Sequence, residues 1–262
     1  MRAVLYEKFG PPEVLQLIDY PLPQRSSGNV LVKISCTSVN PVDLKIRKGS
    51  IAIAIKHKIL GGDLAGVVEA ADADSEFVKG DRVFALSPDW SFRSKWGCYA
   101  EYATIKSSLL ARIPDSISFE QAAALPMVSL TAMQALEAAQ VKSGQRVLIH
   151  GGSGGVGSAG VQIAKAWGAH VTSTCSTKNM QLVKELRADE VTDYTQTSVD
   201  QVFKDKPFDA VLDVVGGCSG ASRALGPKFT KFFTFPLEQA VVAHRHAETG
   251  RPAGKIVITV AV

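Results

Sequence analysis

The sequence predicts an α/β protein in which a small β-barrel is joined to a domain built around a parallel sheet. Up to about residue 120 the chain contains short β-prone runs bounded by Gly, Asp and Pro, such as LAGVVEAA and GDRVFAL. This spacing is typical of a small antiparallel barrel. Beyond about residue 145, β-prone runs alternate with helical ones. Because parallel neighbouring strands need a crossover connection, this alternation indicates a parallel sheet covered by helices.

The order of elements in the second part follows from hydrophobic spacing. Around Pro126, the stretch FEQAAALPMVSLTAMQALEAAQ carries Ala, Leu and Met at helical intervals. A further helix is expected from Val156 to Trp167, and another over MQLVKELR. The expected strands are RVLIH (146–150), HVTST (170–174), EVTDY (190–194) and DAVLDVVG (209–216).

The last part of the chain predicts a return to the barrel. FPLEQAVVAHRHAETGRPAGKIVITVAV is typical of an amphipathic helix, a Gly/Pro turn and a final strand. That strand needs a β-partner, and the barrel offers partners. We therefore expect residues 1–122 as the barrel domain, 123–231 as the nucleotide domain, and 232–262 as a helix and strand added to the first domain.

Composition and charge exclude several classes of protein. The chain is 46% hydrophobic and 21% charged, as in ordinary globular proteins. Its apolar runs, such as 51–55, fall short of the roughly 20 residues of a membrane span. The 29 basic residues are interspersed with 25 acidic ones, so no nucleic-acid partner is expected. With no visible targeting segment, a cytoplasmic location is expected, and a peripheral location on an organelle stays open.

The four cysteines predict neither a disulfide framework nor a zinc or redox motif. Cys36, Cys98, Cys175 and Cys218 lie far apart, and no C-x-x-C pair is present. Reduced thiols in a reducing compartment are therefore expected.

The stretch HGGSGGVGSAG predicts a binding site for a dinucleotide. Gly152, Gly154 and Gly157 form G-x-G-x-x-G directly between an expected strand and an expected helix. In that setting the glycines allow a tight turn and a close approach of the backbone to a pyrophosphate. The helix N-terminus meanwhile presents unpaired N–H groups to the anion.

The residues after the second strand of this domain favour NADPH over NADH. An NAD site usually places Asp or Glu there, to bind the ribose 2′-hydroxyl. This chain has Thr-Cys-Ser-Thr-Lys over 174–178 instead. Ser176 and Lys178 would hold a 2′-phosphate, with Tyr194 near that phosphate or the adenine. Alternatively, Lys178 is a solvated lysine and Tyr194 an ordinary aromatic residue at a strand end.

The chain resembles a known family over nearly its whole length. The matching stretches occur in order: SVNPVDLKIRKG, GGDLAGVVEA, KGDRVFAL, GCYAEYATI, AAALPMVSLTAMQAL, VLIHGGSGGVGSAGVQIAKAWGAHVTSTC, ADEVTDY, FDAVLDVVGG and GKIVITV. They resemble the zinc-free medium-chain dehydrogenases/reductases, in the quinone oxidoreductase branch related to zeta-crystallin and the reticulon-4-interacting proteins. The resemblance implies a GroES-like barrel, a Rossmann-type domain, NADPH as hydride donor and usually a homodimer.

The resemblance also predicts that no metal takes part. Zinc-dependent relatives place a Cys where this chain has the Ser38–Asn40 stretch. They place the His of a Gly-His-Glu motif within the stretch that here is Gly61, Gly62 and Asp63. With both ligands missing, a catalytic zinc ion lacks its binding residues.

The resemblance implies direct hydride transfer to a small quinone or an α,β-unsaturated carbonyl compound. Asn40 and Asp43 would line the substrate side, and Thr131 would lie near the nicotinamide. Around the pyrophosphate would lie Ser153, Gly154, Gly155 and Val156. Alternatively, the Asn40–Pro41 step mainly holds a turn of the barrel.

Two other functions stay open. Some enoyl-thioester reductases of this superfamily donate a proton from a Tyr after the Asn-Pro motif. This chain has KGSIAIAI there, without a Tyr, which argues against that function. A catalytically weak or inactive NADPH-binding protein is the other alternative, because two further βα units, about 50 to 60 residues, are missing after DAVLDVVGG. The sheet would then stop at its fourth strand, with Val211, Leu212 and Val214 on an exposed edge or against the tail.

The aromatic loop 89–96 lies either at the rim of the substrate site or on the barrel surface.

Overall fold

A computed structural model describes residues 1–51, 58–88, 95–197, 202, 207–215, 232–249 and 255–260. The chain divides into two compact units. Unit 1 is Met1–Met127 with Phe232–Val262, and unit 2 is Val128–Lys231. Each unit contains its own cluster of buried apolar side chains. Among the described residues, no helix is long and apolar enough to cross a membrane.

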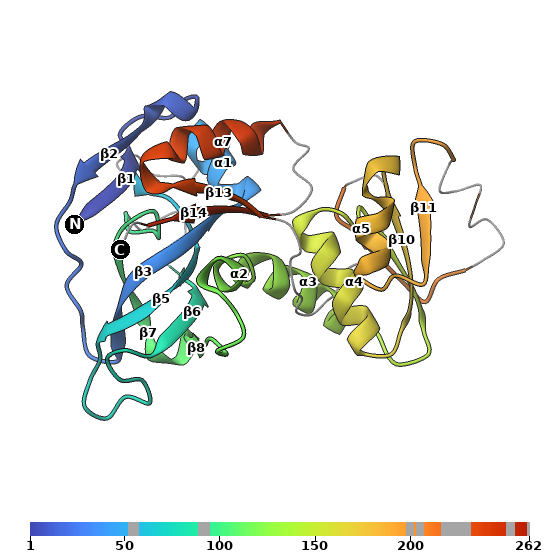
Figure 1. Ribbon diagram of the computed structural model, residues 1–262, viewed down its shortest axis with the longest axis horizontal. Coiled ribbons are helices and arrows are strands. Elements are labelled where there is room, and N and C mark those ends of the chain that lie inside the picture. Colours follow the sequence, from blue (N-terminus) through green and yellow to red (C-terminus); the bar gives the residue numbers. More distant parts are fainter. Residues whose placement is uncertain are drawn as a thin grey trace. The chain divides into compact units, whose positions relative to one another are not determined.

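Unit 1 contains two sheets that are antiparallel except for the β13–β14 pair, as expected for a GroES-like barrel (Figure 1). The smaller sheet has the order β2-β1-β4, with β1 at Arg2–Tyr6, β2 at Leu15–Asp19 and β4 at Lys58–Ile59. The larger sheet has the order β13-β14-β3-β5-β6-β8, and β7 also pairs with β3. Its strands are β3 (Asn29–Val39), β5 (Asp63–Ala70), β6 (Arg82–Leu86), β7 (Tyr102–Lys106), β8 (Ala111–Arg112), β13 (Phe232–Pro236) and β14 (Lys255–Thr259).

The strand β3 holds unit 1 together because it pairs along its whole length. On one edge, Asn29–Lys33 pairs with β7 and Cys36–Val39 pairs with β14, both antiparallel. On the other edge β3 pairs with β5. Strand β14 thereby pairs with β3 on the edge where the pairing with β7 ends. Strand β14 is almost completely buried.

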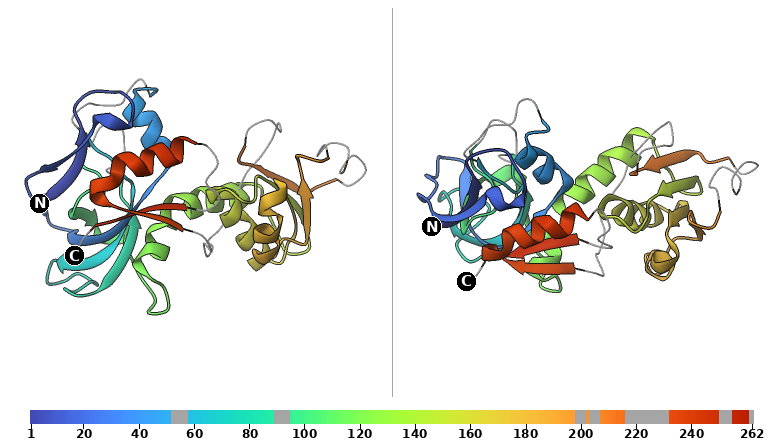
Figure 2. Two further views of the ribbon diagram at one scale, coloured as in Figure 1. Left: turned by 45° about the horizontal axis from the view of Figure 1, so that its top comes forward. Right: turned by 90° about the horizontal axis from the view of Figure 1, so that it is seen from above.

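Three helices accompany these sheets: α1 (Pro41–Lys48), α2 (Phe119–Ala123) and α7 (Ala240–Glu248). Helix α1 starts with Pro at its first position, where the missing N–H costs nothing. Helix α7 lies against β13 and β14, which run side by side beneath it (Figure 2). Strand β13 is not predicted by the sequence pattern, because the helix, turn and strand expected at the end of the chain start only at Phe235. It is parallel to β14, with Phe232 opposite Lys255.

Unit 2 has a parallel sheet of four strands in its described part, with the order β11-β10-β9-β12. The strands are β9 (Arg146–His150), β10 (His170–Cys175), β11 (Glu190–Asp193) and β12 (Ala210–Asp213). The helices are α3 (Pro126–Ala138), which starts in unit 1, then α4 (Gly155–Ala166) and α5 (Met180–Glu185). The expected α/β class, a barrel domain with a Rossmann-type parallel sheet, is confirmed.

The edge strand β12 is less exposed than its sequence led us to expect. Leu212 is 3% exposed, and it lies over α4 so closely that a Cβ at Gly160 would come within 2.6 Å of it. Val214 packs on the same core, whereas Val215 is 62% exposed. Strand β14 of the tail pairs instead with β3 in unit 1.

A buried Tyr–His pair joins α7 to the core of unit 1. His244 is fully buried, and its Nε2 lies 3.1 Å from the hydroxyl of Tyr99. The two rings meet edge to face, with centroids 5.7 Å apart. Burial, followed by the charge of Arg47, lowers the pKa of His244 to about 3. The imidazole is therefore neutral in the folded protein.

Replacing His244 by Gln should make the free energy of unfolding depend less on pH between pH 3 and pH 7. Below pH 6.5 the unfolded chain takes up a proton that folded His244 refuses until about pH 3, so stability is lost as the pH falls through this window. The full loss of stability, reached below about pH 3, is about 5 kcal/mol. Urea unfolding of both proteins between pH 3 and pH 7 checks this. Parallel curves for wild type and His244→Gln would contradict it.

Candidate functional site

The G-x-G-x-x-G stretch forms the turn between β9 and α4. The strand ends at His150, and α4 begins at Gly155 with Gly154 as its N-cap. No side chain caps this helix, which is 12 residues long. Its first N–H groups are therefore available to an anion, as at a phosphate-binding helix N-terminus.

The three glycines of the motif have different surroundings. A Cβ at Gly152 would lie 2.0 Å from Oγ of Ser173, and one at Gly157 would lie 2.2 Å from the carbonyl oxygen of Gly151. Neither position has room for a side chain. At Gly154 the nearest atom, the carbonyl oxygen of Gly151, would be 3.5 Å from the Cβ, an ordinary contact, so a methyl group fits there without a collision. That is the arrangement expected when backbone packing requires the first and third glycines and a pyrophosphate occupies the space beside the second.

Hydroxyl groups of β10 fix this turn. Oγ1 of Thr174 accepts a hydrogen bond of 3.1 Å from the Gly151 N–H and lies 2.7 Å from Nδ1 of His150. Ser173 Oγ donates to the Ile149 carbonyl over 2.8 Å. Both hydroxyl residues are fully buried. Sequence analysis did not assign them; the signal was the polar run Thr-Ser-Thr inside a buried strand.

The expected 2′-phosphate residues lie after β10, beside the glycine turn. Ser176 is half-buried and precedes the short helix η4 (Thr177–Asn179), in which Lys178 is exposed. The amide Nδ2 of Asn179 donates to Ser153 Oγ over 3.1 Å and to Ser176 Oγ over 3.4 Å. Asn179, which sequence analysis missed, therefore links the glycine turn to Ser176.

Tyr194 follows β11 and is 52% exposed. Its N–H donates to the carbonyl of Cys175 over 3.2 Å. Thus the turns after β10 and β11, which carry Lys178 and Tyr194, are joined through the backbone.

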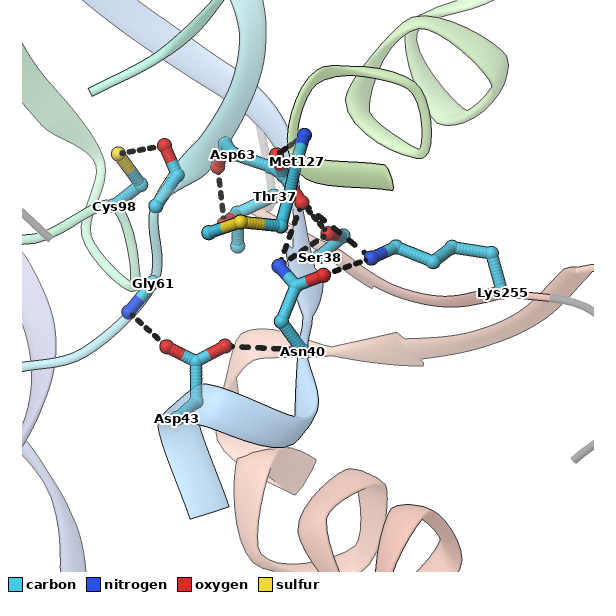
Figure 3. A network of polar contacts seen from close by, with 10 residues as sticks. Thr37, Ser38, Asn40, Asp43, Gly61, Asp63, Cys98, Met127 and Lys255 are labelled. Atoms are coloured by element: carbon cyan, nitrogen blue, oxygen red, sulfur yellow. Dashed lines mark hydrogen bonds and ion pairs between the residues drawn. The ribbon is translucent and has the colours of Figure 1, made fainter. Parts of the chain in front are cut away.

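A second polar cluster lies in the interior of unit 1 (Figure 3). At its centre is Asp63, fully buried at the start of β5. Oδ2 of Asp63 accepts from Asn40 Nδ2 over 2.7 Å and from the Ser38 hydroxyl. Oδ1 accepts from the Met127 N–H over 2.7 Å. The charge is balanced by Lys255, whose Nζ lies 3.5 Å from Oδ2.

Lys255 also fixes the orientation of Asn40. Its Nζ donates to Asn40 Oδ1, so the amide nitrogen of Asn40 faces Asp63. Burial lowers the pKa of Lys255, while the nearby carboxylates of Asp63 and Asp43 oppose that shift.

Ser38, Asn40 and Asp63 of this cluster belong to the two stretches that the resemblance matches to the zinc ligands of zinc-dependent relatives. Ser38 and Asn40 are bound to Asp63, and Gly62 offers no ligand in place of a His. Within the described ranges, no three His, Cys, Asp or Glu side chains gather closely enough to hold a metal ion.

Asp43 is fully engaged within the fold. Oδ2 accepts from the Asn40 N–H over 2.8 Å, and Oδ1 accepts from the Gly61 N–H over 3.2 Å. Burial raises the pKa of Asp43 to about 7, although these two N–H groups act against the rise. The two contacts hold the start of α1 and join it to Gly61. For Asp43 they favour the alternative in which this stretch mainly holds a turn of the barrel.

The remaining expected residues fall elsewhere. Thr131 is exposed on α3, in unit 2. The same unit contains Ser153, Gly155 and Val156, which are half-buried at the glycine turn and the start of α4. Residues 89–94 of the aromatic loop and the second half of KGSIAIAI, residues 52–55, lie outside the described residues.

Comparisons with known proteins agree with this fold. The family model of the Alcohol dehydrogenase GroES-like domain matches residues 26–115, and that of the Zinc-binding dehydrogenase matches residues 155–226. Human NAD(P)H oxidoreductase RTN4IP1, a mitochondrial protein, is 37% identical over 88% of this chain and 63% of its own. Human Quinone oxidoreductase is 38% identical over 82% of this chain and 66% of its own.

A solved structure extends the comparison to three dimensions. The quinone oxidoreductase from Coxiella burnetii has a TM-score of 0.87 and 31% identity, covering 100% of this chain and 99% of that one. The curated relatives named above are longer, and this chain spans 63% and 66% of their lengths.

The GroES-like barrel, the parallel sheet and the glycine turn between β9 and α4 together are the fold of the medium-chain dehydrogenases/reductases. The chain belongs to the medium-chain dehydrogenase/reductase superfamily, in its quinone oxidoreductase branch.

Replacing Lys255 by Met should destabilise unit 1 by about 2 to 4 kcal/mol, because the carboxylate of Asp63 stays buried without its cation. The double variant Lys255→Met/Asp63→Asn should recover most of the loss, since the buried charge of Asp63 is removed together with that of its cation. Urea unfolding of wild type, single and double variants measures both effects. A double variant no more stable than the single one would refute the pairing.

Replacing Gly154 by Ala should leave the fold intact and abolish dinucleotide binding, because the added methyl group fits beside the turn without a collision and takes the room proposed for the pyrophosphate. Replacing Gly157 by Ala should instead cost about 1 to 3 kcal/mol of stability, because the methyl group collides with backbone. Thermal unfolding and NADPH fluorescence titration separate the two effects. NADPH binding by Gly154→Ala with wild-type affinity would contradict this assignment.

Proposed function

We propose that this protein is an NADPH-dependent, zinc-independent reductase of small quinones or α,β-unsaturated carbonyl compounds. The observation that carries the proposal is the β9–α4 turn, where packing excludes a side chain at Gly152 and Gly157 and leaves space beside Gly154. The names of relatives support the substrate class: quinone oxidoreductase, and an NADPH-dependent alkenal/one oxidoreductase of Arabidopsis thaliana that is 34% identical.

The chain's contribution to the reaction is binding and orientation. When bound, NADPH supplies the hydride. The backbone N–H groups at the start of α4 would hold the pyrophosphate, flanked by Ser153, Gly155 and Val156. Fixing cofactor and acceptor in a reactive geometry accounts for most of the acceleration in such a reaction.

Support for NADPH comes from the turn after β10. Ser176 and Lys178 supply a hydroxyl and a cation, the groups that bind a phosphate dianion. Asn179 holds Ser176 and Ser153 in place through its side-chain amide. Tyr194 stands exposed at the end of β11, where it can contact the adenosine part of the cofactor.

Zinc independence is supported by the residues of the buried cluster. The carboxylate of Asp63 is neutralised by Lys255 and bonded to Asn40 and Ser38, so it is not free for a metal. For the substrate side we propose Asn40, whose amide is held in one orientation, together with Asp43 as the residue that fixes the Asn40 turn. Thr131 is proposed to lie near the nicotinamide.

A second candidate is an NADPH-binding protein with little or no reductase activity. It is favoured by one observation: the described sheet of unit 2 has four strands, whereas the complete dinucleotide fold has six. The missing strands belong to the half that accompanies the nicotinamide end.

Mixing the purified chain with NADPH separates the two candidates. The reductase should oxidise NADPH when 1,2-naphthoquinone or a 2-alkenal is added. The oxidation is measured as a loss of absorbance at about 340 nm. The Gly154→Ala variant is the matched control and should show no enzymatic oxidation. Enhanced NADPH fluorescence without oxidation by any acceptor would overturn the reductase and leave the binding protein. Turnover of a trans-2-enoyl-CoA in place of both acceptors would support enoyl-thioester reduction instead.

A further inference from the structure

A carboxylate lies unexpectedly close to the proposed 2′-phosphate site. In this class of domain the acid that binds the ribose follows the second strand. Here that strand, β10, ends at Cys175, but Asp193 at the end of β11 pairs in register with Cys175. Asp193 therefore places its carboxylate one strand further along the same edge of the sheet.

The side chain of Asp193 joins the two turns that carry the proposed cofactor residues. Its Oδ1 accepts from the N–H and the hydroxyl of Thr195, over 2.9 and 2.7 Å. Its Oδ2 accepts from the hydroxyl of Thr177, the residue between Ser176 and Lys178. Asp193 thus fixes the turn of Tyr194 and ties it to the turn of Lys178.

The carboxylate is also charged under working conditions. The hydrogen bond from Thr177, followed by those from Thr195, lowers the pKa of Asp193. A negative charge therefore stays beside a site where we expect a phosphate dianion.

We propose that Asp193 is a specificity-determining residue that positions both turns and limits the preference for NADPH over NADH. This inference rests on the proposed function of the glycine turn and of Lys178. The charge of Asp193 repels a 2′-phosphate but not the neutral 2′-hydroxyl of NADH. Thr177 moderates this repulsion, because its hydroxyl engages Oδ2.

Two nearly isosteric variants should change the preference in opposite directions. Asp193→Asn keeps an oxygen for the Thr195 contacts and removes the charge. It should tighten NADPH binding roughly threefold to tenfold and leave NADH nearly unchanged. Thr177→Val removes the hydroxyl and keeps the charge, so the ratio of NADPH to NADH affinity should fall. Asp193→Ala removes the acceptor as well and should weaken both cofactors.

The test is a fluorescence titration of the full chain with NADPH and with NADH, for wild type and the variants, at low and at high salt. The effect of Asp193→Asn on the affinity ratio should shrink as salt screens the charge. Lys178→Ala is the matched reference, since it should weaken NADPH much more than NADH.

Two failures are distinguishable. An Asp193→Asn variant that changes both affinities by the same factor, or neither, overturns the role of Asp193 while wild-type NADPH binding upholds the proposed function. If the wild-type chain binds neither cofactor, both proposals are overturned. Far-ultraviolet circular dichroism of each variant shows that the fold is kept, so a changed ratio reports charge and not unfolding.

Discussion

The close approach of backbone to backbone at the β9–α4 turn is the constraint on which the functional interpretation of this chain depends. The backbone of Gly157 lies against that of Gly151 and Gly152, and Gly152 in turn lies against the side-chain hydroxyl of Ser173, so that no side chain fits at 152 or 157. The same turn makes Gly154 the N-cap of α4, so that no N-cap side chain covers the first N–H groups of the helix. Tight packing and anion binding thus both follow from the geometry of this turn. For that reason a G-x-G-x-x-G pattern between a strand and a helix indicates a dinucleotide site.

Unit 1 depends on a different interaction, the buried pair of Asp63 and Lys255. The lysine comes from the end of the chain and the aspartate from β5, so the pair joins segments far apart in sequence (Figure 3). Buried charges are costly unless they are paired and hydrogen-bonded, and here Ser38, Asn40 and the Met127 N–H complete the shell of the carboxylate. The cluster therefore holds β14 in place, orients Asn40 and uses the positions that a metal would need.

Much of the fold followed from the sequence because hydrophobic spacing and glycine position are local signals. The alternating strands and helices of unit 2 and the barrel of unit 1 were predicted in kind and order. What escaped prediction depends on contacts between distant residues. The strand β13 exists through its pairing with β14, and Asn179, Asp193 and Lys255 acquire roles only through side chains that no spacing rule connects to them. Local patterns cannot show such partners, since each pair is created by folding.

The central claim is that unit 2 binds NADPH through the turns after β9 and β10. It is tested most directly with ligands that carry only the adenosine half of the cofactor, so that the nicotinamide end does not matter. Isothermal titration of the full chain with 2′,5′-ADP and with 5′-AMP makes this comparison. The account predicts that 2′,5′-ADP binds about tenfold more tightly or better, and that Lys178→Ala removes most of the difference. Equal affinity for the two ligands, or no binding of either, would contradict it.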